Sequence, residues 1–122
     1  MIEGEALALA CAEAAADKKA EDIVILDLRG ISSFTDFFIV CSASSDPQLK
    51  AVASSIRESV REKGTRPLNE EGGPTSQWVV IDFGEAIVHL FNSEKREFYN
   101  LESLWKDAPR LRFEPSVPGS RA

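Results

Sequence analysis

Several residue types that carry chemistry are scarce in this chain of 122 residues. It has one histidine, two cysteines and no Cys-x-x-Cys pair, so the ligand set for a zinc site is missing. Cys11 and Cys41 fall in segments with the patterns of a buried helix face and a buried strand, where free cysteine packs as a small hydrophobe. We therefore expect no metal site, no cofactor and no disulfide.

Long apolar runs are absent as well. No stretch reaches the roughly 18 apolar residues that a membrane span needs. The first 20 residues have no basic segment, and Glu13 interrupts their apolar stretch, so they do not resemble a secretory or transit peptide. We expect a cytoplasmic protein.

Positive charge is also in short supply. The formal net charge is −6, and the chain has no basic run of the kind that neutralises phosphates in nucleic-acid binders. An acidic domain is better matched to a basic protein partner, because opposite fields speed the encounter. The charge therefore favours a basic protein partner, with little or no direct nucleic-acid contact.

What is present fits one globular α/β domain. Hydrophobic residues make up 43% of the chain, and the length suits a single core. We expect this domain to span residues 1–108, with a loose, proline-containing tail over 109–122 and no internal repeat. Periodicity and punctuation predict a helix over 3–19, strands over 23–28 and 37–44, a helix from Ser45 or Asp46 to Gly64, and a short edge strand within 65–73. The first helix has an apolar stripe of Leu7, Ala10, Cys11 and Ala14, and the second has a stripe of Leu49, Val52, Ala53, Ile56 and Val60 that we expect to be buried.

The segment 76–91 predicts a β-hairpin that turns at Phe83-Gly84. With a two-residue loop, Trp78 would face His89. Alternation then sorts the side chains onto two faces of the sheet. The aliphatic face holds Val79, Ile81, Ala86, Val88 and Leu90, and the mixed face holds Trp78, Val80, Ile87, His89 and Phe91. The first face is suited to cover by helices, whereas the second is suited to partial exposure or to a partner.

The last predicted helix runs from Leu101 to Asp107 with Asn100 as its cap. Leu101, Leu104 and Trp105 share helical spacing, so we expect part of this aromatic-rich segment to join the core. Tyr99 lies just before the helix and is a candidate for partner contact.

One set of residues occurs in a specific order and spacing over residues 21–109: Thr35-Asp36, Gln48, Glu71-Gly72, Trp78, Asp82, His89, Arg96, Tyr99, Leu101-Glu102 and Leu104-Trp105. This ordered set resembles the Iojap/RsfS family of ribosomal silencing factors.

The resemblance implies a fold and a function. The fold would be a mixed, mostly five-stranded sheet with helices packed on one face, related to nucleotidyltransferases but without their catalytic motif. Members of the family bind the large ribosomal subunit through ribosomal protein fourteen, block joining of the subunits and repress translation when nutrients are limiting. No catalytic residue is implied.

The candidate partner-binding residues combine this resemblance with the residue pattern. They are Trp78, His89, Tyr99, Asp36, Val80, Ile87, Phe91, Arg96 and Glu102. Structural alternatives stay open for several of them: Trp78 and His89 can be a cross-strand pair, Arg96 and Glu102 an internal ion pair, and Asp36 a backbone cap. For Asp82 we favour a turn aspartate that bonds the backbone near Gly84.

Two other functions compete with silencing. One is a homodimeric interaction adaptor that uses the mixed face of the hairpin. The other is a nucleotidyltransferase, which needs clustered carboxylates for magnesium and a Gly-Ser turn for phosphates. The segment CSASSD lacks the glycine, and Asp27, Asp36 and Asp82 are single and scattered, so this reading is the weakest.

Overall fold

The computed structural model describes residues 2–73 and 75–113, with side chains described in those ranges except at residues 98 and 99. The elements are α1 (Gly4–Asp17), β1 (Glu21–Asp27), β2 (Phe37–Ala43), α2 (Asp46–Glu62), β3 (Asn69–Gly73), β4 (Trp78–Asp82), β5 (Ala86–Asn92), α3 (Ser93–Tyr99), α4 (Leu101–Leu104) and β6 (Arg110–Leu111). No helix in the described ranges is long and apolar enough to cross a membrane.

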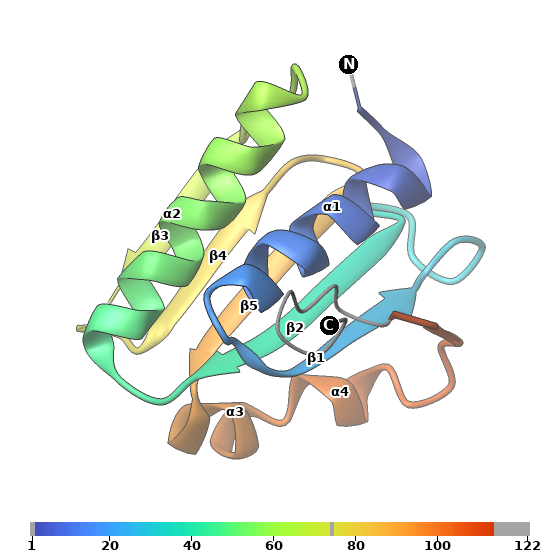
Figure 1. Ribbon diagram of the computed structural model, residues 1–122. Coiled ribbons are helices and arrows are strands. Elements are labelled where there is room, and N and C mark those ends of the chain that lie inside the picture. The colour runs from blue at the N-terminus through green and yellow to red at the C-terminus, as the bar shows by residue number, and fades with distance from the viewer. Residues whose placement is uncertain (1, 74, 114–122) are drawn as a thin grey trace, which may run out of the picture.

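The strands form one mixed sheet in the order β3-β4-β5-β2-β1-β6. The central pair β2 and β5 is parallel, and the other pairs are antiparallel. The long helices α1 and α2 lie side by side over one face (Figure 1). The predicted mixed α/β sheet is therefore confirmed, with six strands where the resemblance implied mostly five.

The sixth strand comes from the segment predicted as a tail. Arg110 and Leu111 pair with Leu26 and Ile25 of β1, and the Asp27 amide donates to the Pro109 carbonyl (2.8 Å). The fold thus continues past the predicted boundary at residue 108. The rest of that tail, 114–122, lies outside the described residues.

The main core fills the space between the sheet and the two long helices. The predicted stripe of α2 is fully confirmed: Leu49, Val52, Ala53, Ile56 and Val60 are all buried. On α1 the buried stripe includes Leu7, Cys11 and Ala14 as predicted, while Ala10 is only half-buried. Both cysteines are buried and free, and burial raises the pKa of the Cys41 thiol to about 12. They act as apolar packing residues, as predicted.

Two polar motifs fix how the chain enters α2. The Ser45 hydroxyl accepts from the Gln48 amide, so Ser45 and not Asp46 is the N-cap. The Gln48 side chain accepts from Ser44 and donates to the carbonyls of Lys18 and Lys19 at the end of α1. One glutamine thereby ties the end of α1 to the start of α2.

The hairpin of β4 and β5 has a wider loop than predicted. Asp82 pairs with Ile87, and Trp78 pairs with Phe91, so the predicted register is wrong by two residues. The loop is held open by the entry to β2: the amides of Asp36 and Phe37 both donate to the Glu85 carbonyl (3.0 Å each), and the Thr35 hydroxyl donates to the Gly84 carbonyl (3.0 Å). A shift of two preserves alternation, so both predicted faces are confirmed.

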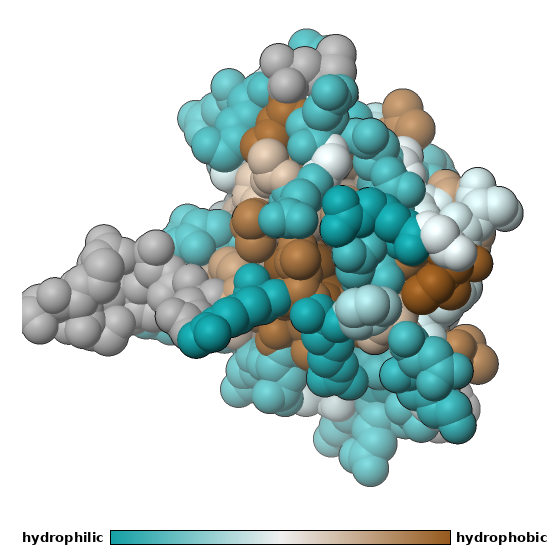
Figure 2. Space-filling model, turned by 90° about the vertical axis from the view of Figure 1, so that its right-hand side faces the viewer, coloured by the Kyte–Doolittle hydropathy of each residue, from teal (hydrophilic) through white to brown (hydrophobic). Residues whose placement is uncertain are grey.

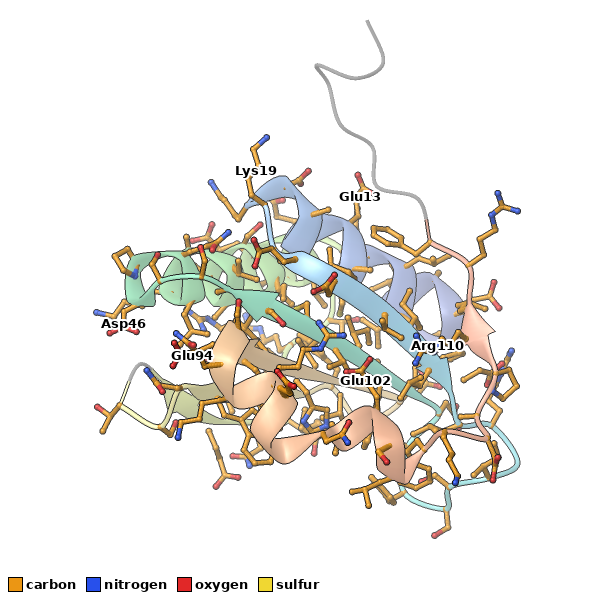
Figure 3. The ribbon with its side chains drawn as sticks, turned by 90° about the horizontal axis from the view of Figure 1, so that it is seen from below. Glu13, Lys19, Asp46, Glu94, Glu102 and Arg110 are labelled. Atoms are coloured by element: carbon orange, nitrogen blue, oxygen red, sulfur yellow. The ribbon has the colours of Figure 1, made fainter. Side chains whose placement is uncertain are left out.

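The second face of the sheet carries a smaller core under α4 and the segment after it. Buried Leu26, Leu28, Phe38, Val40 and Phe91 meet half-buried Leu101 and Trp105. In the view from below, α1 and α2 lie on one side of the sheet while α3 and α4 lie on the other (Figure 3). The short helices therefore cover part of the face that the sequence left open.

The predicted helix over 101–107 is shorter than expected. Helix α4 ends at Leu104, and a separate helix, α3, precedes it. Asn100 joins the two in a left-handed conformation (φ 44°) and makes no side-chain cap to α4. Asparagine tolerates this conformation, which breaks the helix at that point.

Candidate functional site

A row of aromatic rings crosses the second face of the sheet. We call it the aromatic row and define it as Phe34, Trp105, Phe38, His89 and Trp78. Ring centroids lie 6.4 Å apart for Phe34 and Trp105, 5.8 Å for Trp105 and Phe38, 4.5 Å for Phe38 and His89, and 5.9 Å for His89 and Trp78. All four contacts are tilted or edge-to-face, which suits the quadrupoles of the rings. The row links the loop before β2, the sheet and the segment after α4.

His89 is the buried centre of the row. Trp78 Nε1 donates to its Nδ1 (3.3 Å), so the neutral ring carries its proton on Nε2. That Nε2 is buried and has no hydrogen-bond partner within the described residues. Burial lowers the pKa of His89 to about 4, because the charged imidazolium would lose its hydration. The side chain is therefore neutral at physiological pH.

Trp78 and His89 are in contact as the sequence predicted, although they are diagonal neighbours and not a directly opposed pair. Trp78 stacks on its register partner Phe91 with a centroid separation of 5.0 Å. Phe91 has no exposed surface, and Ile87 and His89 are 9% and 7% exposed. These three side chains support the surface from beneath. Trp78 and Val80 are half-buried and are the hairpin residues that can meet a partner.

The most exposed apolar side chains of this region come from outside the hairpin. Phe34 is 60% exposed at one end of the aromatic row, and Leu104, next to Trp105, is 75% exposed. The sequence led us to expect part of the group Leu101, Leu104 and Trp105 in the core, and Phe34 was not singled out. Figure 2 views the molecule from the end that carries the loop over 28–36 and shows apolar atoms between hydrophilic side chains. An exposed apolar cluster with a polar rim is typical of a protein interaction site.

The Arg96 side chain is held by contacts within the domain. Its Nε donates to Glu102 (2.9 Å), and its Nη1 reaches Ser42 Oγ (3.0 Å) and the carbonyls of Glu21 and Asp22. The side chains of Arg96 and Glu102 are only 12% and 21% exposed. The internal ion pair, which the sequence left as an alternative, is the arrangement observed.

Glu102 also connects α4 to the edge of the sheet. Its second oxygen lies 3.9 Å from Arg110 of β6, and both residues are labelled in Figure 3. Because Arg96 also bonds the irregular start of β1, where the register shifts between Glu21 and Val24, the pair holds three separate segments together. Arg96 and Glu102 therefore position the short helices under which the aromatic row lies.

The two acidic candidates, Asp82 and Asp36, differ in the contacts that the structure shows for them. Asp82 Oδ1 accepts from the Gly84 amide (2.7 Å), which is the turn role favoured from the sequence. Asp36 is half-buried, and its backbone bonds Glu85 and Leu28. A partner contact by the Asp36 carboxylate stays a prediction, as does one by Tyr99, whose side chain lies outside the described residues.

The described residues bring no three histidine, cysteine or carboxylate side chains together in a way that could hold a metal ion. Asp27 is engaged by Arg29 at 2.7 Å, and this guanidinium lowers the pKa of its carboxyl. The site is thus an apolar surface backed by a buried histidine.

Comparison with known proteins identifies the family of this chain. The family model described as ribosomal silencing factor during starvation (RsfS) matches residues 2–122. The chain belongs to the RsfS family. A ribosomal silencing factor RsfS from Bacillus subtilis (strain 168) is 44% identical over 98 residues, which are 80% of this chain and 83% of the relative. The chloroplastic protein Iojap of Arabidopsis thaliana is 37% identical over 109 residues, covering 89% of this chain and 45% of that protein.

Solved structures agree with the family assignment. A crystal structure from Chromobacterium violaceum has a TM-score of 0.82 and 28% identity, and it covers 99% of this chain and 100% of the other. A second, from Bacillus halodurans, has a TM-score of 0.79 and 36% identity over 90% of this chain and 100% of the other. The overall fold described above is therefore also found by crystallography in similar proteins.

Proposed function

We propose that this chain binds the large ribosomal subunit through its ribosomal protein fourteen and sterically blocks joining of the small subunit, so that translation is repressed under nutrient limitation. Membership of the RsfS family carries the ribosomal part of this proposal. The half-open aromatic row supplies a surface for recognition. No covalent step is required.

The contact surface we propose combines the accessible part of the hairpin with the exposed end of the aromatic row. Trp78 and Val80 contribute from β4, while Phe34, Leu104 and Trp105 contribute from the loop before β2 and from the segment at α4. Tryptophan and other aromatic residues are common anchors of interfaces because they bury large areas with few torsions. The net charge of −6 suits a basic partner, since opposite fields raise the association rate.

Steric exclusion is sufficient for the proposed effect. A compact domain of this length is roughly 30 Å across. A body of this size cannot lie between two surfaces that have to come into contact. An anchored body of that size prevents close approach of a second particle without any catalytic group. The contact surface must therefore be unoccupied when the protein meets the large ribosomal subunit.

A homodimer that uses the aromatic row is the competing function. Exposed Phe34 and Leu104 favour it as much as they favour a ribosomal partner. The mass in solution separates the two: a tight dimer that does not dissociate at the concentrations of the binding assay would leave the surface unavailable to a ribosomal protein.

Sucrose-gradient sedimentation with purified ribosomal subunits tests the proposal. We expect the wild-type protein to travel with the large subunit and to lower the fraction of joined subunits, and we expect Trp78→Ala to stay at the top of the gradient while remaining folded. A wild-type protein that stays at the top would contradict the proposal. A Trp78→Ala protein that still sediments with the large subunit would contradict the assigned surface alone.

A further inference from the structure

A second candidate site lies on the other side of the sheet, in a groove between α2 and the edge strand β3. We call it the arginine groove. One part has a volume of about 420 Å³ and is lined by Ser54, Arg57, Glu58, Arg61, Arg66 and Pro67. The adjoining part has a volume of about 320 Å³ and shares Ser54 and Arg57 with the first. Each volume falls in the range of roughly 300–1,000 Å³ that small-ligand sites occupy.

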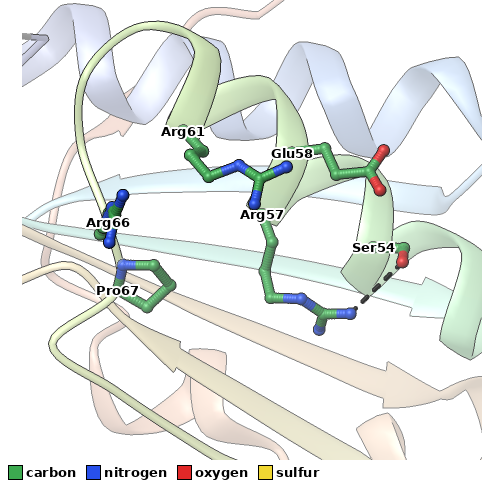
Figure 4. A pocket seen from close by; sticks show the side chains of 6 residues that line it. All are labelled: Ser54, Arg57, Glu58, Arg61, Arg66 and Pro67. Carbon is green, nitrogen blue, oxygen red and sulfur yellow. Dashed lines mark hydrogen bonds between the residues drawn. The ribbon is translucent and has the colours of Figure 1, made fainter.

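Three arginines line the first part of the groove. Arg57 and Arg61 are one helical turn apart on α2, and Arg66 comes from the loop between α2 and β3 (Figure 4). Residues four apart on a helix lie on one face, so the sequence spacing itself brings Arg57 and Arg61 together. Like charges at this spacing repel each other, which is a cost that a bound anion would remove.

The arginines differ in how they are held. Arg57 is oriented by an ion pair with Glu70 (2.6 Å) and donates to Ser54 Oγ (3.3 Å). Arg61 and Arg66 are exposed and have no ion pair with any carboxylate in the described part of the chain. The groove therefore has one fixed guanidinium and two that are available to a ligand.

The adjoining part of the groove is different in chemistry. Leu49, Ala53 and Val79 give it an apolar floor, and Gly72 and Gly73 of the edge strand present backbone without side chains. Its charged members are Lys50, Glu70 and the shared Arg57, which pairs with Glu70. A flat, uncharged group fits such a wall of small and aliphatic residues, and a carboxylate such as Glu70 is a common acceptor for ribose hydroxyls.

The charge of the groove is opposite to that of the chain. Its four cations, Lys50, Arg57, Arg61 and Arg66, exceed its two carboxylates, Glu58 and Glu70, which leaves a local charge of +2 in a chain of net charge −6. A concave cationic spot of this size on an acidic body favours a compact anion. A nucleic-acid strand would instead need an extended basic track along the surface.

We propose that the arginine groove binds a nucleoside diphosphate. The phosphates lie against Arg57, Arg61 and Arg66, and the nucleoside occupies the adjoining part beside Glu70 and Val79. Arginine suits this task because its planar fork donates two parallel hydrogen bonds to phosphate oxygens. The site involves no bond making or breaking. It lies on the opposite side of the sheet from the aromatic row, so it does not depend on the proposed ribosomal function.

Isothermal titration calorimetry at low salt tests this proposal with ADP, GDP, inorganic pyrophosphate and guanosine as probes. The double variant R61A/R66A removes two exposed groove cations. The control K18A/K106A removes two exposed cations elsewhere and so has the same net charge. We expect at least one of the two nucleotides to bind the wild type and the control equally, and to bind R61A/R66A about tenfold or more weakly.

The probes also test the two parts of the groove separately. Pyrophosphate should bind more weakly than the better nucleotide, and guanosine should bind more weakly still, because each occupies one part only. Equal loss of binding in both double variants would overturn the proposal, since net charge alone would then explain it, and so would no measurable binding of ADP or GDP. Tighter binding of a short single-stranded RNA than of either nucleotide, with the same loss in R61A/R66A, would overturn it in favour of an RNA contact.

Discussion

His89 should make the protein less stable as the pH falls from about 7.5 to about 5. The side chain is 7% exposed, and burial lowers its pKa from the ordinary 6.5 to about 4. A histidine whose pKa is lowered by folding binds fewer protons in the folded than in the unfolded state. The free energy of unfolding is therefore highest above pH 6.5 and falls as the pH drops toward the folded-state pKa.

The structure sets the size of this effect. Protonation adds a second N–H at Nδ1, the atom that accepts the Trp78 hydrogen bond, inside a site where His89 is enclosed by Phe38 and Phe91. With pKa values of 6.5 unfolded and about 4 folded, the loss between pH 7.5 and pH 5 is about 2 kcal/mol. Below pH 4 it approaches about 3 kcal/mol.

The substitution His89→Phe isolates this term, because phenylalanine keeps an aromatic ring among aromatic neighbours and cannot titrate. The carboxylates titrate in both proteins and cancel in the difference between them. Urea unfolding at several pH values should show the wild type losing about 2 kcal/mol more than the variant over that interval. Since the chain has one histidine, NMR can also follow its ring directly. A ring pKa near 6.5, or a wild-type and variant difference that does not change with pH, would refute the reasoning.

Two further substitutions test the supports of the site by urea unfolding. Arg96→Met should lower the free energy of unfolding by about 3 kcal/mol, because it removes the guanidinium that bonds Ser42, two backbone carbonyls and the mostly buried Glu102 carboxylate, whereas Arg29→Met at an exposed pair should cost less than about 1 kcal/mol. Equal costs would contradict the structural role of Arg96. Gly72→Ala should cost more than about 2 kcal/mol, since φ is +90° and a Cβ would lie 1.9 Å from the Trp78 carbonyl oxygen. Gly30→Ala is the control: φ is +80° and the added Cβ meets open space, so it should cost about 1 kcal/mol. If Gly72→Ala lowers the free energy of unfolding by no more than Gly30→Ala does, strands β3 and β4 can shift to make room for the Cβ.

Local patterns were sufficient to predict most of the fold. The stripe of α2, the Ser45 alternative for its cap and the edge position of β3 all follow from periodicity, side-chain capping and the proline before the strand. Strand β6 was missed because two residues have no periodicity of their own and pair only through tertiary contact with β1.

The hairpin register was missed for a similar reason. Phe83-Gly84 has the composition of a two-residue turn, and nothing within the segment shows that the carbonyls of Gly84 and Glu85 are bonded by the segment entering β2. The faces were nevertheless predicted correctly, because alternation depends on parity and not on the length of the loop.

The candidate site was predicted in part. The contact of Trp78 with His89 and the turn role of Asp82 followed from residue type and spacing. Burial could not be predicted at single positions: Phe91 is covered, and Leu104 is exposed at the end of helix α4, which has a single turn and begins after the left-handed Asn100. Phe34 stands in a serine-containing loop without periodicity, and only its ring contacts with Phe38 and Trp105 reveal its place in the row.

Joining of purified ribosomal subunits, followed by light scattering, tests the central claim most directly. Leu104→Glu places a charge on the residue before Trp105 of the aromatic row, and Leu68→Glu is a matched control, since both leucines are 75% exposed. We predict that the wild type and Leu68→Glu suppress joining to the same extent, and that Leu104→Glu remains folded and no longer suppresses it. Suppression by Leu104→Glu equal to that of the wild type, or loss of suppression in both variants, would contradict the assignment of the aromatic row as the surface that meets the large subunit.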